Sequence, residues 1–318
     1  MDAVAASASA TKTRDAFAAF YAAAAIEHHE VDDATLAVRR FGSGPAVVLI
    51  HGFPTHGYTW RFLLPQLAEH FTCYTVDLAG LGDSSWSART DFRFTAQARR
   101  VNALLARLGI GRCAIVAHDT GATVARLVAL ADPERVASLA LINTEMPGHR
   151  PPWIPLFCMT ARLPGAALSF KPLLGSKWYL RSGMGFGAFY SDRRLFDDPT
   201  RLGPYVDPLL QSGERLRGML GYLAGIEWNV VDGLREQHAR LEGPTLLLWG
   251  EDDVTFPVAH AERMVKQFAG RATLVRIRHA SLMPHEEEPD EVLNALLPFL
   301  LESLRQPGAE PTARTHPA

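Results

Sequence analysis

Cysteine is scarce in this chain of 318 residues, which contains only Cys73, Cys113 and Cys158. Their number is odd, their spacing is wide, and no two of them form a Cys-x-x-Cys pair. These features disfavour a disulfide framework and a cysteine-based zinc site. The pattern is typical of reduced thiols, and we expect a cytoplasmic protein that holds no metal.

Long apolar runs and a large net charge are also missing. No stretch of eighteen apolar residues occurs, so no membrane-spanning helix is expected. The N-terminal MDAVAASASA lacks the basic and apolar regions of a secretory signal. Because the formal net charge is only −2, neither nucleic acid nor an anionic membrane is an expected partner. A small-molecule substrate is predicted instead.

The chain does contain a regular alternation of apolar strands and amphipathic helices. Five expected strands are AVVLIHG, TCYTVDLAG, CAIVAH, VASLALIN and PTLLLWG. Strands that are apolar on both faces and separated by helices are typical of a parallel sheet covered on both sides. One of the helices is expected over residues 57–70, despite Pro65. The sequence therefore predicts an α/β fold with a mostly parallel central sheet.

The rhythm divides the chain into a core and an insertion. The core is predicted over residues 26–144 and 241–305. Residues 145–240 are rich in proline and large apolar side chains, and are interpreted as a helical cap. Residues 1–25 are interpreted as a disordered segment followed by a short helix, and the Pro-rich residues 306–318 as a disordered tail. A monomer or a homodimer is expected.

Ligands of open parallel sheets bind at the carboxyl ends of the strands. Four such ends carry unusual sequences, which are HGFP, DLAGLGDS, HDTGA and WGEDD. The third of them fits a sharp strand-to-helix turn, because Ala117 and Gly121 place small residues on both sides of Asp119. We therefore expect Asp119 to act as a nucleophile, with its pKa kept low by the helix N-terminus. The N–H groups of Phe53 and Thr120 are the candidate oxyanion donors.

The other strand ends supply two further candidates. Asp253, three residues after Gly250, is preferred over Asp252 as the acid of a catalytic triad. Trp60 is a candidate substrate-binding residue, with packing on the sheet as an equal alternative. The acidic run at residues 286–288 is interpreted as a solvated helix start.

Together, HGFP, DLAGLGDS, HDTGA, WGEDDVTFP and MPHEEEP make residues 30–304 resemble α/β-hydrolases of the epoxide hydrolase and haloalkane dehalogenase group. The resemblance implies an α/β-hydrolase fold with a cap and no cofactor. It also implies that Asp119 attacks an sp³ carbon to form an ester, which a histidine-activated water then hydrolyses. In this family the histidine lies two residues before the Pro-His-Glu-Glu stretch, and that position here is Leu282.

A leucine cannot accept a proton, so the base is in question. His279 and His285 are the candidate substitutes, and the third possibility is that this loop holds no base. Phe53 and Thr120 stand where dehalogenases carry halide-binding residues, so the resemblance favours epoxide opening assisted by cap tyrosines, which are Tyr179, Tyr190, Tyr205 and Tyr222. The alternatives are dehalogenation, ligand binding without hydrolysis, and a lyase-type or isomerase-type reaction.

Overall fold

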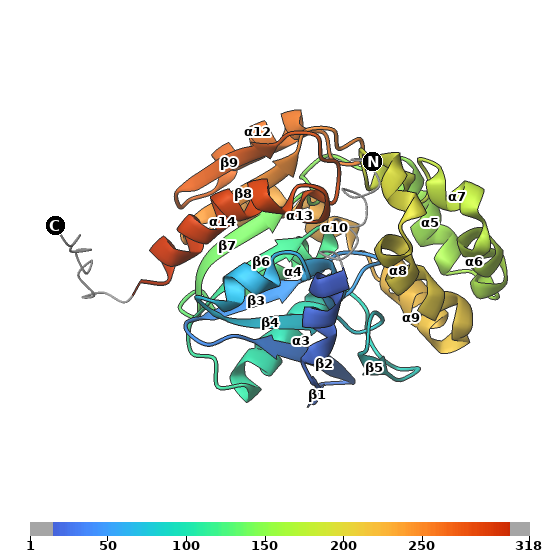
Figure 1. Cartoon of the computed structure of the whole chain (residues 1–318), viewed down its shortest axis with the longest axis horizontal. Coiled ribbons are helices and arrows are strands. Elements are labelled where there is room, and N and C mark those ends of the chain that lie inside the picture. The colour runs from blue at the N-terminus through green and yellow to red at the C-terminus, as the bar shows by residue number, and fades with distance from the viewer. Residues whose placement is uncertain (1–14, 306–318) are drawn as a thin grey trace, which may run out of the picture.

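The computed structural model describes residues 15–305, so the expectations for residues 1–12 and 306–318 lie outside the described part of the chain. One sheet forms the centre of the molecule, and a group of helices lies beyond one end of it (Figure 1). The α/β fold with a mostly parallel central sheet is confirmed.

The nine strands pair in the order β1-β2-β4-β3-β6-β7-β8-β9, with β5 on β2. The neighbours of β2 are antiparallel to it, whereas every pair from β4 to β9 is parallel. All residues of β6 and β8 are buried, as expected for strands covered on both faces. The strands are β1 (Ile26–Val31), β2 (Ala34–Phe41), β3 (Ala46–Ile50), β4 (Thr72–Asp77), β5 (Ser85–Trp86), β6 (Cys113–His118), β7 (Val136–Ile142), β8 (Thr245–Gly250) and β9 (Ala272–Ile277).

Helices cover both faces of this sheet and connect its parallel strands. Residues 15–23 form a further helix, whose buried Tyr21 packs on Phe41 and Tyr58. No helix within residues 15–305 is long and apolar enough to cross a membrane. The core helices are α2 (Leu64–Ala68), α3 (Phe94–Arg107), α4 (Thr120–Ala131), α12 (Val258–Met264), α13 (Pro284–Glu287) and α14 (Pro289–Ser303).

The helix expected over residues 57–70 is shorter and interrupted. A 3₁₀ turn at Gly57–Trp60 is followed by α2, in which Pro65 occupies the first turn. Proline has no N–H to donate within a helix, but the first turn needs no such donor. Pro65 therefore begins a new helix instead of lying inside a longer one.

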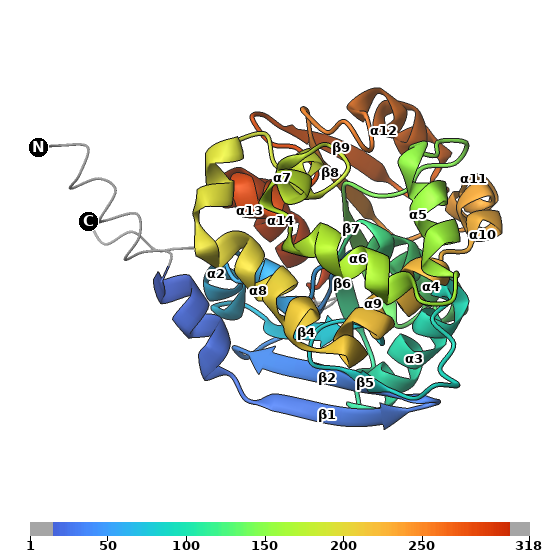
Figure 2. The ribbon, with the colours of Figure 1, turned by 90° about the vertical axis from the view of Figure 1, so that its right-hand side faces the viewer.

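Between β7 and β8 the chain leaves the sheet and forms the cap. Its helices lie toward the viewer in Figure 2, in front of the sheet. Because β7 and β8 are neighbours in the sheet, the chain returns beside the strand that it left. The cap helices are α5 (Trp153–Ala161), α6 (Ala166–Gly175), α7 (Lys177–Arg181), α8 (Pro199–Gln211), α9 (Gly213–Ala224), α10 (Trp228–Asp232) and α11 (Leu234–His238), with short 3₁₀ turns at Phe186–Ala188 and Arg193–Asp197.

Candidate active site

Asp119 lies in the sharp turn between β6 and α4, in a backbone conformation that is rare for a residue with a side chain. Its φ is 50° and its ψ is −129°. Such strained positions cost free energy and occur mostly where function requires them. The turn leaves Asp119 only 7% exposed, at the wall of a cavity between the core and the cap. The sequence pattern around Ala117 and Gly121 therefore does produce a nucleophile-elbow geometry.

Two glycines, Gly52 and Gly121, make this turn possible. At both positions a neighbouring segment of the chain lies too close for a side chain to fit. A Cβ at Gly121 would lie 2.2 Å from the carbonyl oxygen of His51, and a Cβ at Gly52 would lie 2.4 Å from the Cβ of Asp119. Both distances are shorter than real carbon contacts. The strand ends after β3 and β6 therefore meet only because these positions lack side chains.

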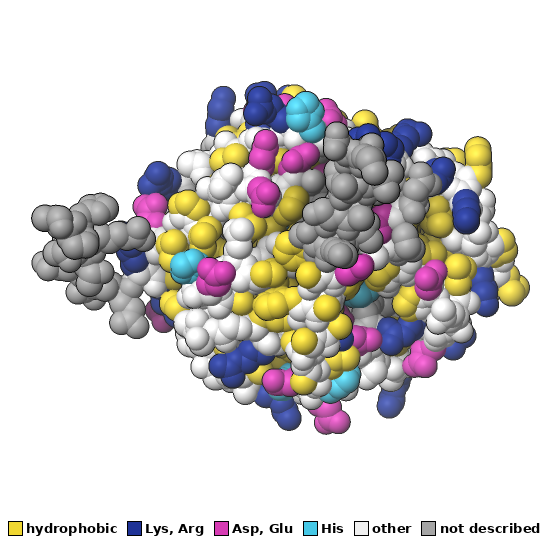
Figure 3. Space-filling model, viewed as in Figure 1, with side chains coloured by type: hydrophobic (Ala, Val, Ile, Leu, Met, Phe, Trp, Pro, Cys, Tyr) yellow, Lys and Arg dark blue, Asp and Glu magenta, His cyan; other side chains and the backbone are white. Residues whose placement is uncertain are grey.

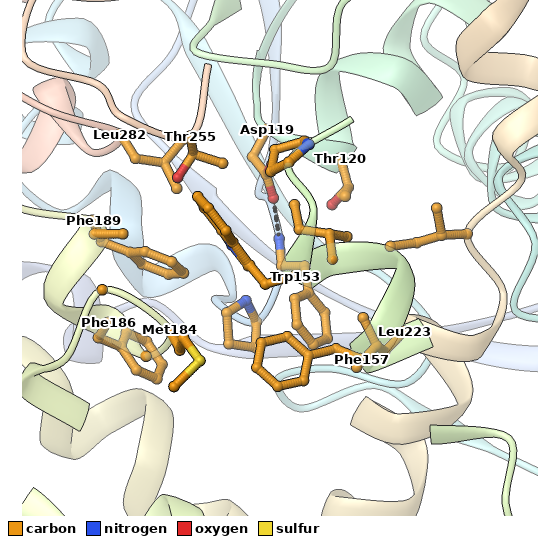
Figure 4. Close-up of a pocket in the computed structure, with 18 of the residues that line it drawn as sticks. Asp119, Thr120, Trp153, Phe157, Met184, Phe186, Phe189, Leu223, Thr255 and Leu282 are labelled. Carbon is orange, nitrogen blue, oxygen red and sulfur yellow. Dashed lines mark hydrogen bonds between the residues drawn. The ribbon is translucent and has the colours of Figure 1, made fainter. Parts of the chain in front are cut away.

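The carboxylate of Asp119 is held by backbone donors. Its Oδ2 accepts a hydrogen bond from the N–H of Phe53 at 2.8 Å, which Figure 4 shows as a dashed line. The N–H of Thr120 also binds the carboxylate. The low pKa expected from the helix N-terminus is nevertheless wrong. Burial and the negative charge of Glu145 raise the pKa of Asp119 well above its usual value, and these effects exceed those of the two N–H donors.

Glu145 is a second carboxylate at the same cavity, and it is also buried. Its Oε2 lies 2.9 Å from the hydroxyl of Thr123 and 3.0 Å from that of Thr144. Both hydroxyls accept hydrogen bonds from the buried guanidinium of Arg126. The Thr144 hydroxyl also lies 2.9 Å from the carbonyl oxygen of Asp119. Burial raises the pKa of Glu145, so two carboxyl groups with raised pKa values face one cavity.

The remainder of the cavity wall is largely apolar and comes mostly from the cap. Leu282 and Thr255 lie on one side of Asp119 and Thr120 on the other, with the aromatic cap residues opposite (Figure 4). An apolar cavity with a few polar groups at one end is typical of a small-molecule site. The large apolar residues of the wall include Trp153, Ile154, Phe157, Phe170, Met184, Phe186 and Phe189.

Leu282, which stands at the position that the resemblance assigns to the histidine, lines the same cavity as Asp119. The two candidate substitutes lie elsewhere. His279 is exposed on the turn after β9, with a φ of 58°. His285 is fully buried outside the cavity, where its Nε2 lies 2.7 Å from the hydroxyl of Thr59. Burial holds the pKa of His285 well below its usual value. In this geometry neither histidine reaches Asp119, because one points to solvent and the other packs in the core.

One histidine does line the cavity within the described residues, and it is His149 at the start of the cap. Its Nε2 donates to the backbone carbonyl of Thr255 at 2.8 Å. A carbonyl can only accept, so the neutral ring carries its proton on Nε2 and its lone pair on Nδ1. His149 was not among the residues that the sequence analysis selected.

The position of Asp253 fits the role of a triad acid better than that of Asp252. Asp253 is 4% exposed, and its carboxylate accepts hydrogen bonds from Thr255 and Phe256 N–H groups and from the Asn143 side chain. Burial raises its pKa to about 6. Asp252 is exposed and accepts from the hydroxyl of Ser191. Within the described residues no histidine hydrogen-bonds to Asp253, so its role in catalysis stays a prediction.

Of the four cap tyrosines, Tyr222 is the one joined to the elbow. Its hydroxyl donates to the Thr120 hydroxyl at 3.1 Å, and its ring stacks on Phe53 with centroids 5.8 Å apart. Tyr190 and Tyr205 donate instead to Glu286. Tyr179 lines the cavity, but its hydroxyl donates to the carbonyl of Met184.

Trp60, the candidate substrate-binding residue, does not line the cavity. It is fully buried, and its ring packs against His285 with centroids 4.8 Å apart. All four residues of the 3₁₀ turn that carries Trp60 are buried. The prediction of a substrate-binding role for Trp60 is therefore not supported, and the geometry agrees better with the alternative, a packing role.

Glu286 is not solvated as expected, because it is 1% exposed and joins the core to the cap. Its carboxylate pairs with Arg61 of the core at 3.0 Å and with Arg201 of the cap at 3.4 Å. It also accepts hydrogen bonds from the hydroxyls of Tyr190 and Tyr205. These cations hold the pKa of Glu286 well below its usual value, despite its burial. The loop that carries Leu282 is thereby fixed between the two parts of the molecule.

We expect Arg61→Met to lower the free energy of unfolding by about 3–5 kcal/mol, because it leaves a buried carboxylate with only part of its compensation. Urea unfolding measures the change. The control is Arg271→Met, which breaks an exposed pair with Glu302 and should change the stability little. Equal effects of the two substitutions would contradict the importance given to the Glu286 cluster.

Sequence reasoning missed Glu145 and Asn143, although a signal was present. Asn143 follows the apolar strand VASLALI directly and Glu145 lies two residues later, and the carboxyl ends of neighbouring parallel strands meet at one edge of the sheet. Asn143 donates to Asp253 and accepts from the N–H of Gly250, so it connects the ends of β7 and β8. Asp119 and Asp253 were predicted from their positions at the carboxyl ends of parallel strands, and Asn143 and Glu145 lie at such an end too.

Comparisons with known proteins show the family and the fold of the chain. A family model described as alpha/beta hydrolase fold matches residues 45–289. The chain is 26% identical over 275 residues to epoxide hydrolase 4 of Mus musculus, which covers 82% of this chain and 74% of that protein. The solved structure of the epoxide hydrolase CorEH superposes with a TM-score of 0.72 at 22% identity, covering 88% of this chain and all of the other. A haloalkane dehalogenase variant, DbeA-M1 of Bradyrhizobium elkanii, gives 0.68 at 21% identity, covering 88% and 97%.

Proposed function

Because the chain is a hydrolase of the α/β-hydrolase fold family, we propose that it opens epoxides of small or medium apolar molecules through nucleophilic attack by Asp119. The observation that carries this proposal is that Asp119 and Thr120 both line one end of an apolar cavity, with the buried Tyr222 bonded to Thr120. The Asp119 carboxylate is held by the Phe53 N–H, and the Tyr222 hydroxyl donates to Thr120 beside it. A nucleophile and a proton source are the two groups that ring opening needs.

In the first step, the free oxygen of Asp119 bonds to a ring carbon and the carbon–oxygen bond of the epoxide breaks. The oxygen that leaves the carbon takes a proton from the Thr120 hydroxyl, which recovers one from Tyr222. Burial and the nearby carboxylate of Asp119 raise the pKa of Tyr222, so its phenol remains protonated and available as a donor. The product of this step is a hydroxyalkyl ester of Asp119.

In the second step, water attacks the ester carbonyl carbon and the diol leaves. The Asp119 oxygen that is bonded to the Phe53 N–H becomes the oxyanion, and the Thr120 N–H is the second donor. We assign the proton of the attacking water to Glu145, since neither His279 nor His285 reaches the cavity. Glu145 passes this proton to the diol oxygen as its bond to the Asp119 carbonyl carbon breaks. Asp119 is left as a carboxylic acid, and its proton returns to Tyr222 through the Thr120 hydroxyl, which restores the starting state. Ester formation removes the negative charge of Asp119, and this favours the ionised form of Glu145 when a base is needed. No step requires a cofactor.

The geometry favours epoxides over haloalkanes, the alternative substrates. A departing halide needs donors that hold an anion, whereas an opening epoxide needs a proton. The Phe53 side chain stacks on Tyr222, and the Thr120 hydroxyl accepts from the same tyrosine. These two positions therefore support proton delivery rather than halide binding.

Intact-protein mass spectrometry tests the proposal with a panel of terminal and aryl epoxides and matched haloalkanes. We expect a rise by the whole mass of one epoxide molecule, because ring opening releases no atom, and the adduct should map to residues 113–126, the tryptic peptide that contains Asp119. Tyr222→Phe should slow adduct formation by about 10–100-fold, since it removes one general-acid contribution. Tyr179→Phe is the control and should change the rate little. Labelling by haloalkanes alone would instead favour the dehalogenase.

Glu145→Gln separates the two steps. Adduct formation needs ionised Asp119, so its rate should rise with pH through the raised pKa of that carboxyl. Replacing the negatively charged Glu145 should lower the pKa of Asp119. The rise in the labelling rate should then occur at lower pH. The same substitution should slow release of the ester by at least about tenfold, because it removes the proposed base. Stopped-flow labelling measures the first effect, and the decay of the adduct in fresh buffer measures the second.

His149→Gln is the matched control for that experiment, since it changes the histidine that lines the same cavity. We expect unchanged ester release in this variant. If His149→Gln stops release and Glu145→Gln does not, then Nδ1 of His149 is the base and the assignment to Glu145 is incorrect.

A further inference from the structure

The outer side of the cap carries many of the large apolar side chains that the protein exposes. Seven of the eleven exposed large hydrophobic residues in the described part of the chain belong to α5, α6, α7 and the turns beside them. Leu168 is 82% exposed and Trp178 is 76% exposed. Exposed large apolar residues that gather in one part of a protein are a common feature of interaction sites. The seven residues are Leu156, Met159, Leu163, Leu168, Leu173, Trp178 and Met184, the last of which also lines the cavity.

The same segment has a charge of one sign. Residues 146–191 contain five basic residues and no acidic one, although the whole chain has a net charge of −2. The remainder of the chain therefore carries a net charge of −7, and the small total conceals a basic segment. The expectation that no anionic membrane is a partner rested on that total, and it does not describe this segment. Lys171 and Lys177 are exposed between the apolar residues. Figure 3 shows hydrophobic and basic side chains side by side at the margin where α5, α6 and α7 lie in Figure 1.

These helices also form the wall of the active-site cavity with their inner sides. On α6, Phe170 lines the cavity while Leu168 is exposed, and on α7, Tyr179 lines it while its neighbour Trp178 is exposed. On α5, Phe157 lines the cavity and Leu156 is exposed. One thin layer of helices therefore separates the apolar cavity from the apolar and basic surface.

From this arrangement we propose that the outer face of the cap docks on an anionic lipid surface, with Leu168 and Trp178 in the interface and Lys171 and Lys177 at the lipid phosphates. Mixed apolar and basic side chains on short helices are typical of proteins that lie on membranes without crossing them. Exposed tryptophan prefers the level of the lipid headgroups. The occupant is anionic, because Lys171 and Lys177 are exposed and residues 146–191 contain no acidic residue to offset them.

A second copy of the chain fits this face less well. A symmetric interface would place the basic segments of the two copies against each other, and like charges brought together destabilise an interface. A lipid surface offers the opposite charge and an apolar phase together. It would also place the cavity next to a reservoir of apolar molecules.

Cosedimentation with vesicles tests the proposal without using catalysis. We expect the purified protein to bind vesicles of phosphatidylcholine with about one-quarter phosphatidylglycerol, and to bind phosphatidylcholine alone much more weakly. The double variants Lys171→Glu/Lys177→Glu and Leu168→Ser/Trp178→Ser should each weaken binding at least about tenfold. The control Lys266→Glu/Leu301→Ser changes an exposed lysine and an exposed leucine outside the cap and should bind normally. Thermal unfolding shows whether each variant remains folded.

Three results would overturn the proposal. They are no binding to anionic vesicles, equal loss of binding in the control, and a dimer that Leu168→Ser/Trp178→Ser converts to a monomer, which would assign the face to a second copy. Because binding is measured without substrate, its failure leaves the chemistry at Asp119 untouched. Failure of epoxide labelling would likewise leave the vesicle result standing.

Discussion

Asp119→Asn is expected to abolish covalent labelling by epoxides, with a fall in the rate of adduct formation of about 10⁴-fold or more. The amide has nearly the same shape as the carboxylate and can still accept the hydrogen bond from the Phe53 N–H. It is, however, a very poor nucleophile. Intact mass measured over time gives the rate, and the mass of the untreated variant shows whether the amide has hydrolysed back to the acid.

The controls for this prediction use the other buried carboxylates. Asp253→Asn should keep labelling, because the proposed first step does not use Asp253. The Asp119→Asn variant should be at least as stable to heat as the wild type, since it removes one of two neighbouring buried carboxyl groups whose pKa values are raised. Labelling that persists in Asp119→Asn would mean that another group is alkylated and that the elbow is not the reacting site.

The sequence was sufficient to predict the elbow because its determinants are local. A buried strand that ends in Ala117, followed by Asp119 and Gly121, specifies a turn that only small neighbours permit. The contact to Phe53 was also predictable, because parallel strands bring their carboxyl ends to one edge of the sheet. Periodicity and the positions of the glycines are therefore sufficient to predict the elbow and its contact to Phe53.

The electrostatics of the site could not be predicted in the same way. The helix N-terminus lowers the pKa of Asp119 by a local effect, and the sequence shows that helix. Burial under the cap and the charge of Glu145 act in the opposite direction, and both arise only when distant segments pack together. The predicted direction of the Asp119 pKa shift was wrong because the larger contributions to this pKa come from tertiary structure.

Tertiary packing also determines which of several tyrosines or histidines lies at the site. Four cap tyrosines were equivalent in the sequence, but only the position of Tyr222 on α9 faces Thr120. His285 looked like a possible base, yet its ring packs between Trp60 and His118 in the core. The direction of a side chain from a helix or loop depends on how that element is docked, and residue spacing does not determine it.

Leu282→His is expected to raise steady-state turnover of epoxides by about 10²–10⁴-fold, the contribution of a well-placed general base. Leu282 lines the cavity with Asp119, and Asp253 is buried nearby with its carboxylate already oriented by Thr255, Phe256 and Asn143. We expect an imidazole at this position to lie between the Asp253 carboxylate and the ester of Asp119. Diol production measures turnover, and the amount of lasting adduct should fall in parallel.

Leu282→Gln is the matched control, because it introduces a polar side chain of similar size that cannot act as a base. It should leave turnover near the wild-type value. If the histidine variant labels normally but turns over no faster, the ester is protected from water and the cavity itself limits hydrolysis. If both substitutions raise turnover, the leucine acts by excluding water rather than by lacking a base. Only a gain confined to the histidine would show that this site retains every part of a hydrolytic triad except the base.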